Sequence, residues 1–127
     1  MTGQPYSVLI IDDAYTVREY LRQTLSHLGI NNVEEAENGS DGLTAFNEQQ
    51  PDLVFLDIEL PDINGQQLLQ QIKARDDKTQ VVIVTAHNSV DNVQQSIAAG
   101  ASGFIAKPFS PQKIKNIVER CLAAKLN

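Results

Sequence analysis

Residues 52–62, Asp-Leu-Val-Phe-Leu-Asp-Ile-Glu-Leu-Pro-Asp, decide the fold of this chain. Within them, the four consecutive apolar residues from Leu53 to Leu56 are typical of a short strand that is buried on both faces. The strand ends in a carboxylate, Asp57, and a buried carboxylate is costly unless it has a partner. We therefore predict that Asp57 is chemically active and that the rest of the chain supplies its partners.

Apolar runs and helical patterns alternate along the whole chain on both sides of this stretch. This order predicts a parallel sheet with helices on both faces, in a single three-layer doubly wound α/β domain over residues 1–127. The second strand is the most polar of the five, which favours an edge position. The patterns predict strands over residues 7–11, 33–37, 53–56, 80–85 and 103–106, and helices over 14–28, 41–49, 64–75, between 89 and 100, and from 111 onward.

Serine residues stand before three of the helical patterns and are suited to cap them. Ser40, Ser89 and Ser110 take these positions, and Pro111 is compatible with a first helical residue. The helix after Ser89 has apolar residues on one face, and the last helix has a core-facing stripe. These residues are Val90, Val93 and Ile97 in the former, and Ile114, Ile117, Val118, Cys121 and Leu122 in the latter.

Composition and charge argue against several classes of function. The chain carries 16 acidic and 10 basic residues, a formal net charge of −6, whereas a nucleic-acid-binding domain is expected to be basic. No apolar run approaches the roughly 20 residues that span a bilayer, so no membrane insertion is expected. The single cysteine, Cys121, cannot form an internal disulfide, which favours a cytoplasmic location and a role as an apolar filler.

Polar residues follow four of the predicted strands. Asp12 and Asp13 follow the first, Asp57 the third, Thr85 ends the fourth and Lys107 follows the fifth. Because the carboxyl ends of parallel strands meet at one edge, these five side chains are expected to converge. Three carboxylates in one place repel each other unless a cation lies among them. Oxygen ligands without Cys or His favour Mg²⁺, with Mn²⁺ as a substitute.

Each of these residues also has a simpler interpretation when it is taken alone. Asp12 and Asp13 are suited to a helix cap and a turn, the Thr85 hydroxyl to a bond with the backbone, and Lys107 to a solvated charge. Their joint occurrence at four different strand ends favours a functional site over these separate roles.

With these residues in place, the chain resembles the receiver domain of two-component response regulators, from Val8 to about Leu126. The resemblance implies the flavodoxin-like strand order 2-1-3-4-5 and a cis peptide bond before Pro108. The matching segments are Leu9-Ile10-Ile11-Asp12-Asp13 with Arg18, Leu56-Asp57 with Leu60-Pro61 and Gly65, Val84-Thr85-Ala86, and Gly103-Phe104-Ile105-Ala106-Lys107-Pro108-Phe109.

The resemblance implies phosphorelay signal transduction. Asp57 would accept a phosphoryl group from a phosphohistidine of a sensor histidine kinase or histidine phosphotransfer protein, and Lys107 and Thr85 would bind phosphoryl oxygens. Such a domain is a signalling module rather than an enzyme, although it assists its own phosphorylation and dephosphorylation. The physics agrees, because phosphoryl transfer is catalysed mainly by positioning groups and by neutralising charge.

The resemblance also assigns the metal site and the residues that tune it. Asp13, Asp57 and the backbone carbonyl of Glu59 would hold Mg²⁺, and Asp12 would act largely through a bound water. The Glu59 side chain and His87 stand where the family varies, so they are candidates to set the lifetime of the phosphorylated state. Either could order an attacking water, or the two could pair; a simply solvated His87 is the alternative.

The switch and the interaction surfaces are likewise expectations from the resemblance. Thr85 would move toward the phosphoryl group and leave space for Phe104 to swing inward; Phe104 as an ordinary core aromatic is the alternative. The predicted fourth helix, fifth strand and fifth helix would form the output surface for an unidentified protein target. The first helix, with Ala14, Tyr15 and Arg18 near the pocket, would dock the kinase. A monomer is expected, and phosphorylation-dependent dimerisation is left open.

Several alternatives are weighed against this interpretation. The chain could be a receiver cut from a longer regulator, although the initial Met and the end directly after the last helix favour a stand-alone receiver. A phosphatase of the haloacid dehalogenase type would need its Asp-x-Asp-x-Thr motif after the first strand. A flavodoxin-like carrier would need a phosphate loop where this chain has Asp12 and Asp13. A degenerate receiver would lack some of the five polar residues, and all are present.

Overall fold

Five strands and five helices alternate along the chain, as the hydrophobic pattern predicts. The computed structural model describes residues 6–126, so the predicted domain bounds of 1–127 extend beyond the described residues at both ends. The strands are β1 (Ser7–Ile11), β2 (Asn32–Ala36), β3 (Leu53–Leu56), β4 (Gln80–Thr85) and β5 (Gly103–Ala106). The helices are α1 (Tyr15–His27), α2 (Gly39–Gln49), α3 (Gly65–Arg75), α4 (Val90–Ala98) and α5 (Pro111–Leu126).

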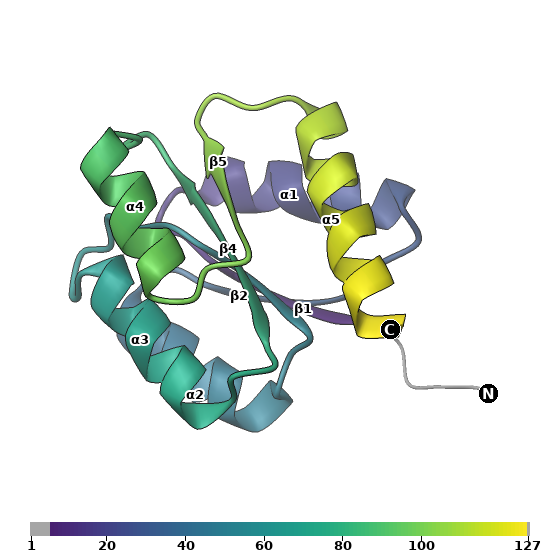
Figure 1. Ribbon diagram of the computed structural model, residues 1–127. Helices are drawn as coiled ribbons and strands as arrows, with labels where there is room; N and C mark the ends of the chain where they lie inside the picture. The colour runs from purple at the N-terminus through teal and green to yellow at the C-terminus, as the bar shows by residue number, and fades with distance from the viewer. Residues whose placement is uncertain (1–5, 127) are drawn as a thin grey trace.

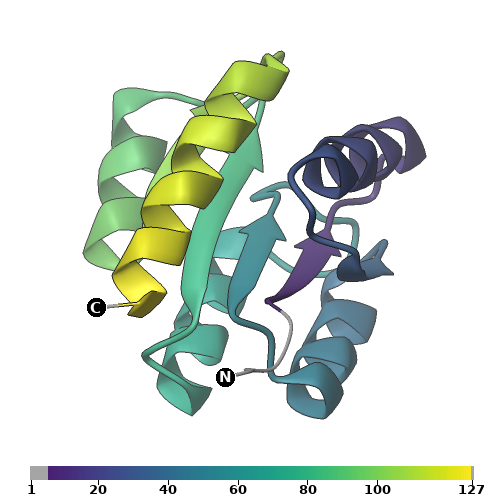
Figure 2. The ribbon, with the colours of Figure 1, turned by 90° about the vertical axis from the view of Figure 1, so that its right-hand side faces the viewer.

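The strands form one parallel sheet in the order β2-β1-β3-β4-β5, which confirms the expected doubly wound topology (Figure 1). Helices α1 and α5 cover one face, and α2, α3 and α4 cover the other (Figures 1 and 2). Within residues 6–126, no helix has both the length and the apolar character needed to cross a membrane.

The central strands are buried because each face contributes to a separate apolar core. Along β1, Val8 and Ile10 pack with α1 and α5, whereas Leu9 and Ile11 pack with α2 and α3. All four side chains are 0% exposed, which explains why the strand is continuously apolar rather than alternating. Along β1 and β3 the acidic residues therefore stand at the carboxyl ends, where Asp12 and Asp57 follow the strands.

The start of α2 differs from the prediction that Ser40 caps a helix beginning at Asp41. The helix begins at Gly39, and its cap is Asn38, whose side chain accepts the Asp41 N–H at 2.7 Å. The N–H groups of Gly39 and Ser40 donate instead to the carboxylate of Asp62, at 2.7 and 2.9 Å. The prediction was wrong because Asp62, which is remote in sequence, accepts the first helical N–H groups, so the helix can begin before Ser40.

Helix α4 presents two of the three apolar residues of its predicted face to solvent, whereas the third, Val93, is half-buried. Val90 and Ile97, which the periodicity places on one face, are 69% and 60% exposed. The buried side chain of this helix is Ser96. By contrast, α3 buries Leu68, Leu69 and Ile72, the stripe expected of a helix that covers a sheet. The predicted cap Ser89 is present and accepts the Asn92 N–H at 3.2 Å.

Candidate functional site

The five polar residues predicted to converge lie together beyond the carboxyl ends of β1, β3, β4 and β5. Asp12 and Asp57 are 2% and 6% exposed, and Thr85 is fully buried. Asp13 is exposed, and the Lys107 side chain is 18% exposed. The site is therefore a buried polar cluster with one open side.

Lys107 joins the two buried carboxylates. Its Nζ donates to Asp12 Oδ2 at 2.8 Å and to Asp57 Oδ2 at 2.9 Å. The peptide bond between Lys107 and Pro108 is cis, as the resemblance predicts. The ammonium group thus compensates two carboxylates that burial would otherwise leave without a counter-charge.

Burial and the hydrogen bonds between Lys107 and its partners together shift the pKa values of Asp12 and Lys107. Burial raises the pKa of the Asp12 carboxyl above its usual value, and the hydrogen bond from Lys107 offsets this rise only in part. Burial acts to lower the pKa of Lys107, but the hydrogen bonds to Asp12 and Asp57 outweigh it, so that pKa lies above its usual value. Lys107 is consequently charged at neutral pH, and burial makes the ionised form of Asp12 electrostatically costly.

The turn after β3 holds Asp57 from its other side. The Glu59 N–H donates to Asp57 Oδ1 at 3.0 Å, so both carboxylate oxygens of Asp57 have protein partners. The loop returns at Gly65, whose N–H donates to the Ile58 carbonyl at 2.7 Å. A Cβ at position 65 would collide with the carbonyl oxygen of Asp57 and with Cα of Ile58. Glycine is required there because the backbone passes so close to the end of the strand.

The acidic residues are close enough together to hold a metal ion. One carboxylate oxygen from each of Asp12, Asp13 and Asp57 lies within 4.8 Å of the others. Among residues 6–126, these three are the group of Asp, Glu, His or Cys side chains that meets this spacing. All the donors are oxygens, which fits a hard divalent cation such as Mg²⁺. The open side at Asp13 leaves room for water ligands, which Mg²⁺ usually retains.

Thr85 and Phe104 lie on neighbouring strands. The Thr85 Oγ1 accepts the His87 N–H at 3.2 Å, so the hydroxyl is tied to the loop that follows β4. In the β4–β5 register, Thr85 is opposite Ala106, and Phe104 comes two residues earlier on β5. Phe104 is half-buried and packs against the core on the side of α3 and α4. The coupling of these two residues as a switch stays a prediction.

The side chains of Glu59 and His87 are paired at the rim of the site. This pair joins the loop after β3 to the loop after β4, and the side chains are 65% and 56% exposed. Of the roles considered for His87, pairing with Glu59 is therefore the one present in the structure.

Arg18 lies near the pocket, as expected, but it is not part of an exposed docking surface. Its side chain is only 11% exposed. It points inward and donates from Nη1 to the Asp12 carbonyl oxygen at 2.6 Å. Helical periodicity gave no signal of this contact, because the partner is a backbone atom of the preceding loop.

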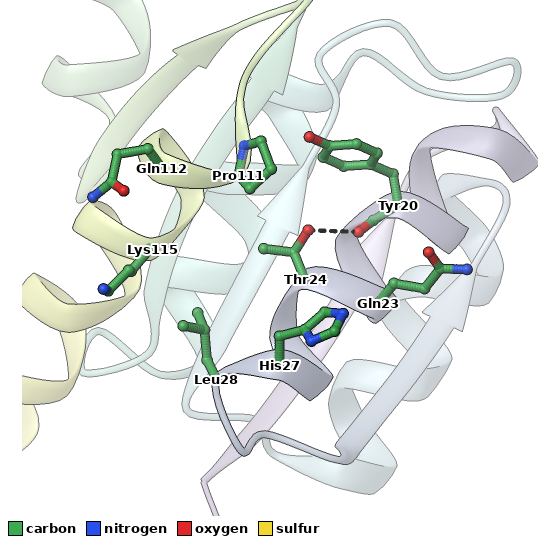
Figure 3. Close-up of a pocket in the computed structure, with 8 residues that line it drawn as sticks. All are labelled: Tyr20, Gln23, Thr24, His27, Leu28, Pro111, Gln112 and Lys115. Carbon is green, nitrogen blue, oxygen red and sulfur yellow. Dashed lines mark hydrogen bonds between the residues drawn. The ribbon is translucent and has the colours of Figure 1, made fainter.

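A separate cavity of about 330 Å³ lies between α1 and α5 (Figure 3). Tyr20 and His27 line it from α1, Leu28 from the position directly after that helix, and Pro111 and Lys115 from α5. It contains none of the predicted site residues. The cluster at the strand ends, and not this cavity, is the candidate functional site.

Comparisons with known proteins identify the family to which the chain belongs. The family model for the response regulator receiver domain matches residues 8–119. The sporulation initiation phosphotransferase F of Bacillus subtilis is 34% identical over 120 residues, covering 94% of this chain and 96% of that protein. The chemotaxis protein CheY of the same organism is 33% identical over 117 residues, covering 92% of this chain and 98% of that protein.

Solved structures show the same fold. The CheY-like response regulator receiver domain protein from Methanospirillum hungatei has a TM-score of 0.89 at 28% identity, covering 96% of this chain and 98% of that one. The receiver domain of NtrX from Brucella abortus has a TM-score of 0.86 at 32% identity, covering 92% and 98%. The chain therefore belongs to the response regulator receiver domains, the signalling modules of two-component phosphorelays.

Proposed function

We propose that this receiver takes up a phosphoryl group on Asp57. One observation carries the proposal: Asp57 is a buried carboxylate that shares a single ammonium group, Lys107, with a second buried carboxylate, Asp12. A fold maintained for stability alone would not be expected to bury two acids against one base. Such an arrangement is expected where an anionic phosphoryl group binds, because the Lys107 ammonium can then neutralise its charge.

The transfer would form one bond and break another. An Asp57 carboxylate oxygen attacks the phosphorus of a phosphohistidine, the P–N bond breaks, and the imidazole nitrogen keeps the electron pair. Lys107 would turn from the carboxylates to the phosphoryl oxygens, and the Thr85 hydroxyl would donate to another of them. The resulting acyl phosphate is hydrolysed when water attacks the same phosphorus, so the domain assists both its phosphorylation and its dephosphorylation.

The metal site would be formed by Asp12, Asp13, Asp57 and the backbone carbonyl of Glu59. When bound, Mg²⁺, or Mn²⁺ in its place, would neutralise charge on the phosphoryl oxygens. Asp13 and Asp57 would be direct ligands, and Asp12 would act largely through water. The spacing of the three carboxylates, with their oxygens within 4.8 Å of one another, supports this assignment.

The output would be read on the surface formed by α4, β5 and α5. Withdrawal of the Thr85 hydroxyl toward the phosphoryl group would open space beside β5 and let Phe104 move inward. The exposed apolar residues Val90 and Ile97 support this choice of surface, because apolar side chains exposed on one helix face are typical of a partner-binding site. The downstream partner would be a protein rather than a nucleic acid.

The phosphoryl donor would dock beside α1. A groove of about 520 Å³ between α1 and the loop after β5 reaches Lys107, and Val17, Tyr20 and Phe109 give it an apolar lining. Such a surface fits a helix of a sensor kinase or histidine phosphotransfer protein, which would bring its phosphohistidine to Asp57. With a cytoplasmic kinase as the partner, the receiver would work in the cytoplasm, as a monomer over residues 1–127.

The deciding experiment is incubation with acetyl phosphate and Mg²⁺, followed by measurement of the intact mass. We expect the wild type to gain one phosphoryl group, and the Asp57→Asn variant to gain none. Asp52→Asn, at the other end of β3, is the matched control and should be phosphorylated like the wild type. An equal gain in Asp57→Asn, or no gain in the wild type, would overturn the proposal.

A further inference from the structure

The guanidinium group of Arg18 is held inside the molecule by three contacts. Its Nη1 donates to the Asp12 carbonyl at 2.6 Å, and its Nε donates to Glu35 Oε1 on β2 at 3.2 Å. The Tyr15 ring lies against it, 5.7 Å from ring centroid to Cζ. A cation this far from solvent needs such partners, and here the only charged one is Glu35.

Arg22 provides an internal comparison one helical turn further along α1. It pairs with the same carboxylate, donating from Nε to Glu35 Oε2 at 2.8 Å. Its second contact is the Val33 carbonyl on β2, at 3.5 Å, and its side chain is 49% exposed. The two arginines thus share an anchor, but only Arg18 reaches the loop after β1.

The carbonyl that Arg18 binds belongs to the peptide unit between Asp12 and Asp13. Asp12 is held by further bonds, because its N–H donates to the Ala36 carbonyl at 3.0 Å and its Oδ1 accepts the Ala14 N–H at 2.9 Å. In contrast, no hydrogen bond among residues 6–126 is recorded for the Asp13 carboxylate. The direction of Asp13 therefore depends on the orientation of its backbone, which is held on one side by the bond at the Asp12 carbonyl and on the other by the bond of the Ala14 N–H.

We propose that Arg18 is a positioning residue for the metal site, which fixes the peptide unit between Asp12 and Asp13 and so aims the Asp13 carboxylate at the cation. Glu35 anchors the guanidinium group in the position from which it does so. The inference rests on the proposed metal site. It assigns to Arg18 an internal role in place of the docking role expected from the sequence.

The test is Mg²⁺ binding to the unphosphorylated full chain, measured by titration calorimetry. Removing a group that orients a metal ligand typically costs 10- to 100-fold in affinity, so we expect Arg18→Met to weaken Mg²⁺ binding about 10-fold. Arg22→Met is the matched control, since it removes an arginine from the same carboxylate without touching the Asp12 carbonyl. It should bind Mg²⁺ within about twofold of the wild type.

Two further variants separate positioning from loss of structure. Arg18→Lys keeps a donor that can reach the Asp12 carbonyl, and it should recover part of the affinity that Arg18→Met loses. Glu35→Gln keeps Arg18 but weakens its anchor, so its affinity should lie between those of the wild type and Arg18→Met. Urea unfolding without metal accompanies each titration, and Arg18→Met and Arg18→Lys are compared under conditions in which both are fully folded.

Asp13→Asn distinguishes failure of this inference from failure of the metal assignment. If Asp13→Asn loses Mg²⁺ affinity while Arg18→Met keeps it within twofold, Arg18 is not a positioning residue. The same conclusion follows if Arg22→Met weakens binding as much as Arg18→Met. If Asp13→Asn binds Mg²⁺ like the wild type, the proposed metal site is wrong and the role of Arg18 is overturned with it.

Discussion

The inner and outer parts of the candidate site are held by very different interactions. The inner set, which is buried or nearly so, has side-chain partners within the domain. The rim is exposed. The inner set is Asp12, Asp57, Thr85 and Lys107, and the rim is Asp13, Glu59 and His87.

We expect this difference to divide the residues by role. The inner set would carry out the phosphorylation chemistry, and the rim would set the lifetime of the phosphorylated state. Interactions in the buried set act at low dielectric, so removing one partner leaves an uncompensated charge and a large effect is expected. The pair on the rim is screened by solvent and is worth at most about 1 kcal/mol. We therefore expect substitutions in the inner set to abolish or impair the chemistry, and substitutions on the rim to adjust its timing.

Loss of the shared cation should give the largest effect. Lys107→Met leaves Asp12 and Asp57 side by side without their ammonium partner and removes a group proposed to bind the phosphoryl oxygens. We expect phosphorylation by acetyl phosphate to slow about 100-fold, the size typical of losing one such stabilising donor. Lys113→Met, at an exposed lysine of α5, is the control and should react at the wild-type rate. A rate for Lys107→Met within threefold of the wild type would show that the inner set does not depend on its cation.

The cost of burying Asp12 should appear as pH-dependent stability. Because burial raises its pKa in the folded state, Asp12 binds more protons folded than unfolded, and its contribution to stability falls as pH rises above its ordinary pKa near 3.8. Asp12→Asn removes this cost, so the metal-free variant should be more stable than the wild type by about 1 kcal/mol at pH 7.

The difference should shrink toward zero as pH falls to 3, where the carboxyl is protonated in both states. Urea unfolding of the two proteins from pH 3 to pH 7 measures it. A variant less stable than the wild type at pH 7 would mean that the bond from Lys107 outweighs the burial of this carboxylate.

The rim should give the smallest effect. Without its partner, Glu59 in His87→Ala is free to order a water near the acyl phosphate, so the half-life should shorten by up to about fivefold, the rate equivalent of one exposed ion pair. In a Glu59→Ala background, the same His87→Ala change should have no effect. The half-lives of the phosphorylated wild type, the two single variants and the double variant test the coupling. Four equal half-lives would show that neither residue affects the lifetime of the phosphorylated state.

Much of the fold could be predicted because its signals are local. Apolar runs end at polar residues, and the strands and helices start and stop within about two residues of where the pattern places them. The cap of α2 could not be chosen in this way. Asn38 and Ser40 are both good capping residues, and the choice depends on Asp62, 23 positions beyond Gly39, which only the folded chain brings near.

The candidate site also has features that could be predicted from the sequence and others that could not. Its carboxylates, hydroxyl and lysine could be predicted because strand ends meet at one edge of a parallel sheet. The inward direction of Arg18 could not, since periodicity places it near the face of α1 but does not reveal a contact with the Asp12 carbonyl. Nor could the solvent exposure of Val90 and Ile97 be predicted, because a regular apolar stripe looks the same whether it faces a core or a partner.

The single buried side chain of α4, Ser96, has a consequence for local unfolding. The free energy needed to open a helix depends on the apolar surface it buries, and α4 buries far less than α3 with its three large aliphatic side chains. Amide hydrogens of α4 should therefore exchange with solvent by brief local openings, long before the sheet unfolds. We therefore expect α4 to be repositioned at little energetic cost, and phosphorylation of the proposed acceptor Asp57 is the local change expected to do so.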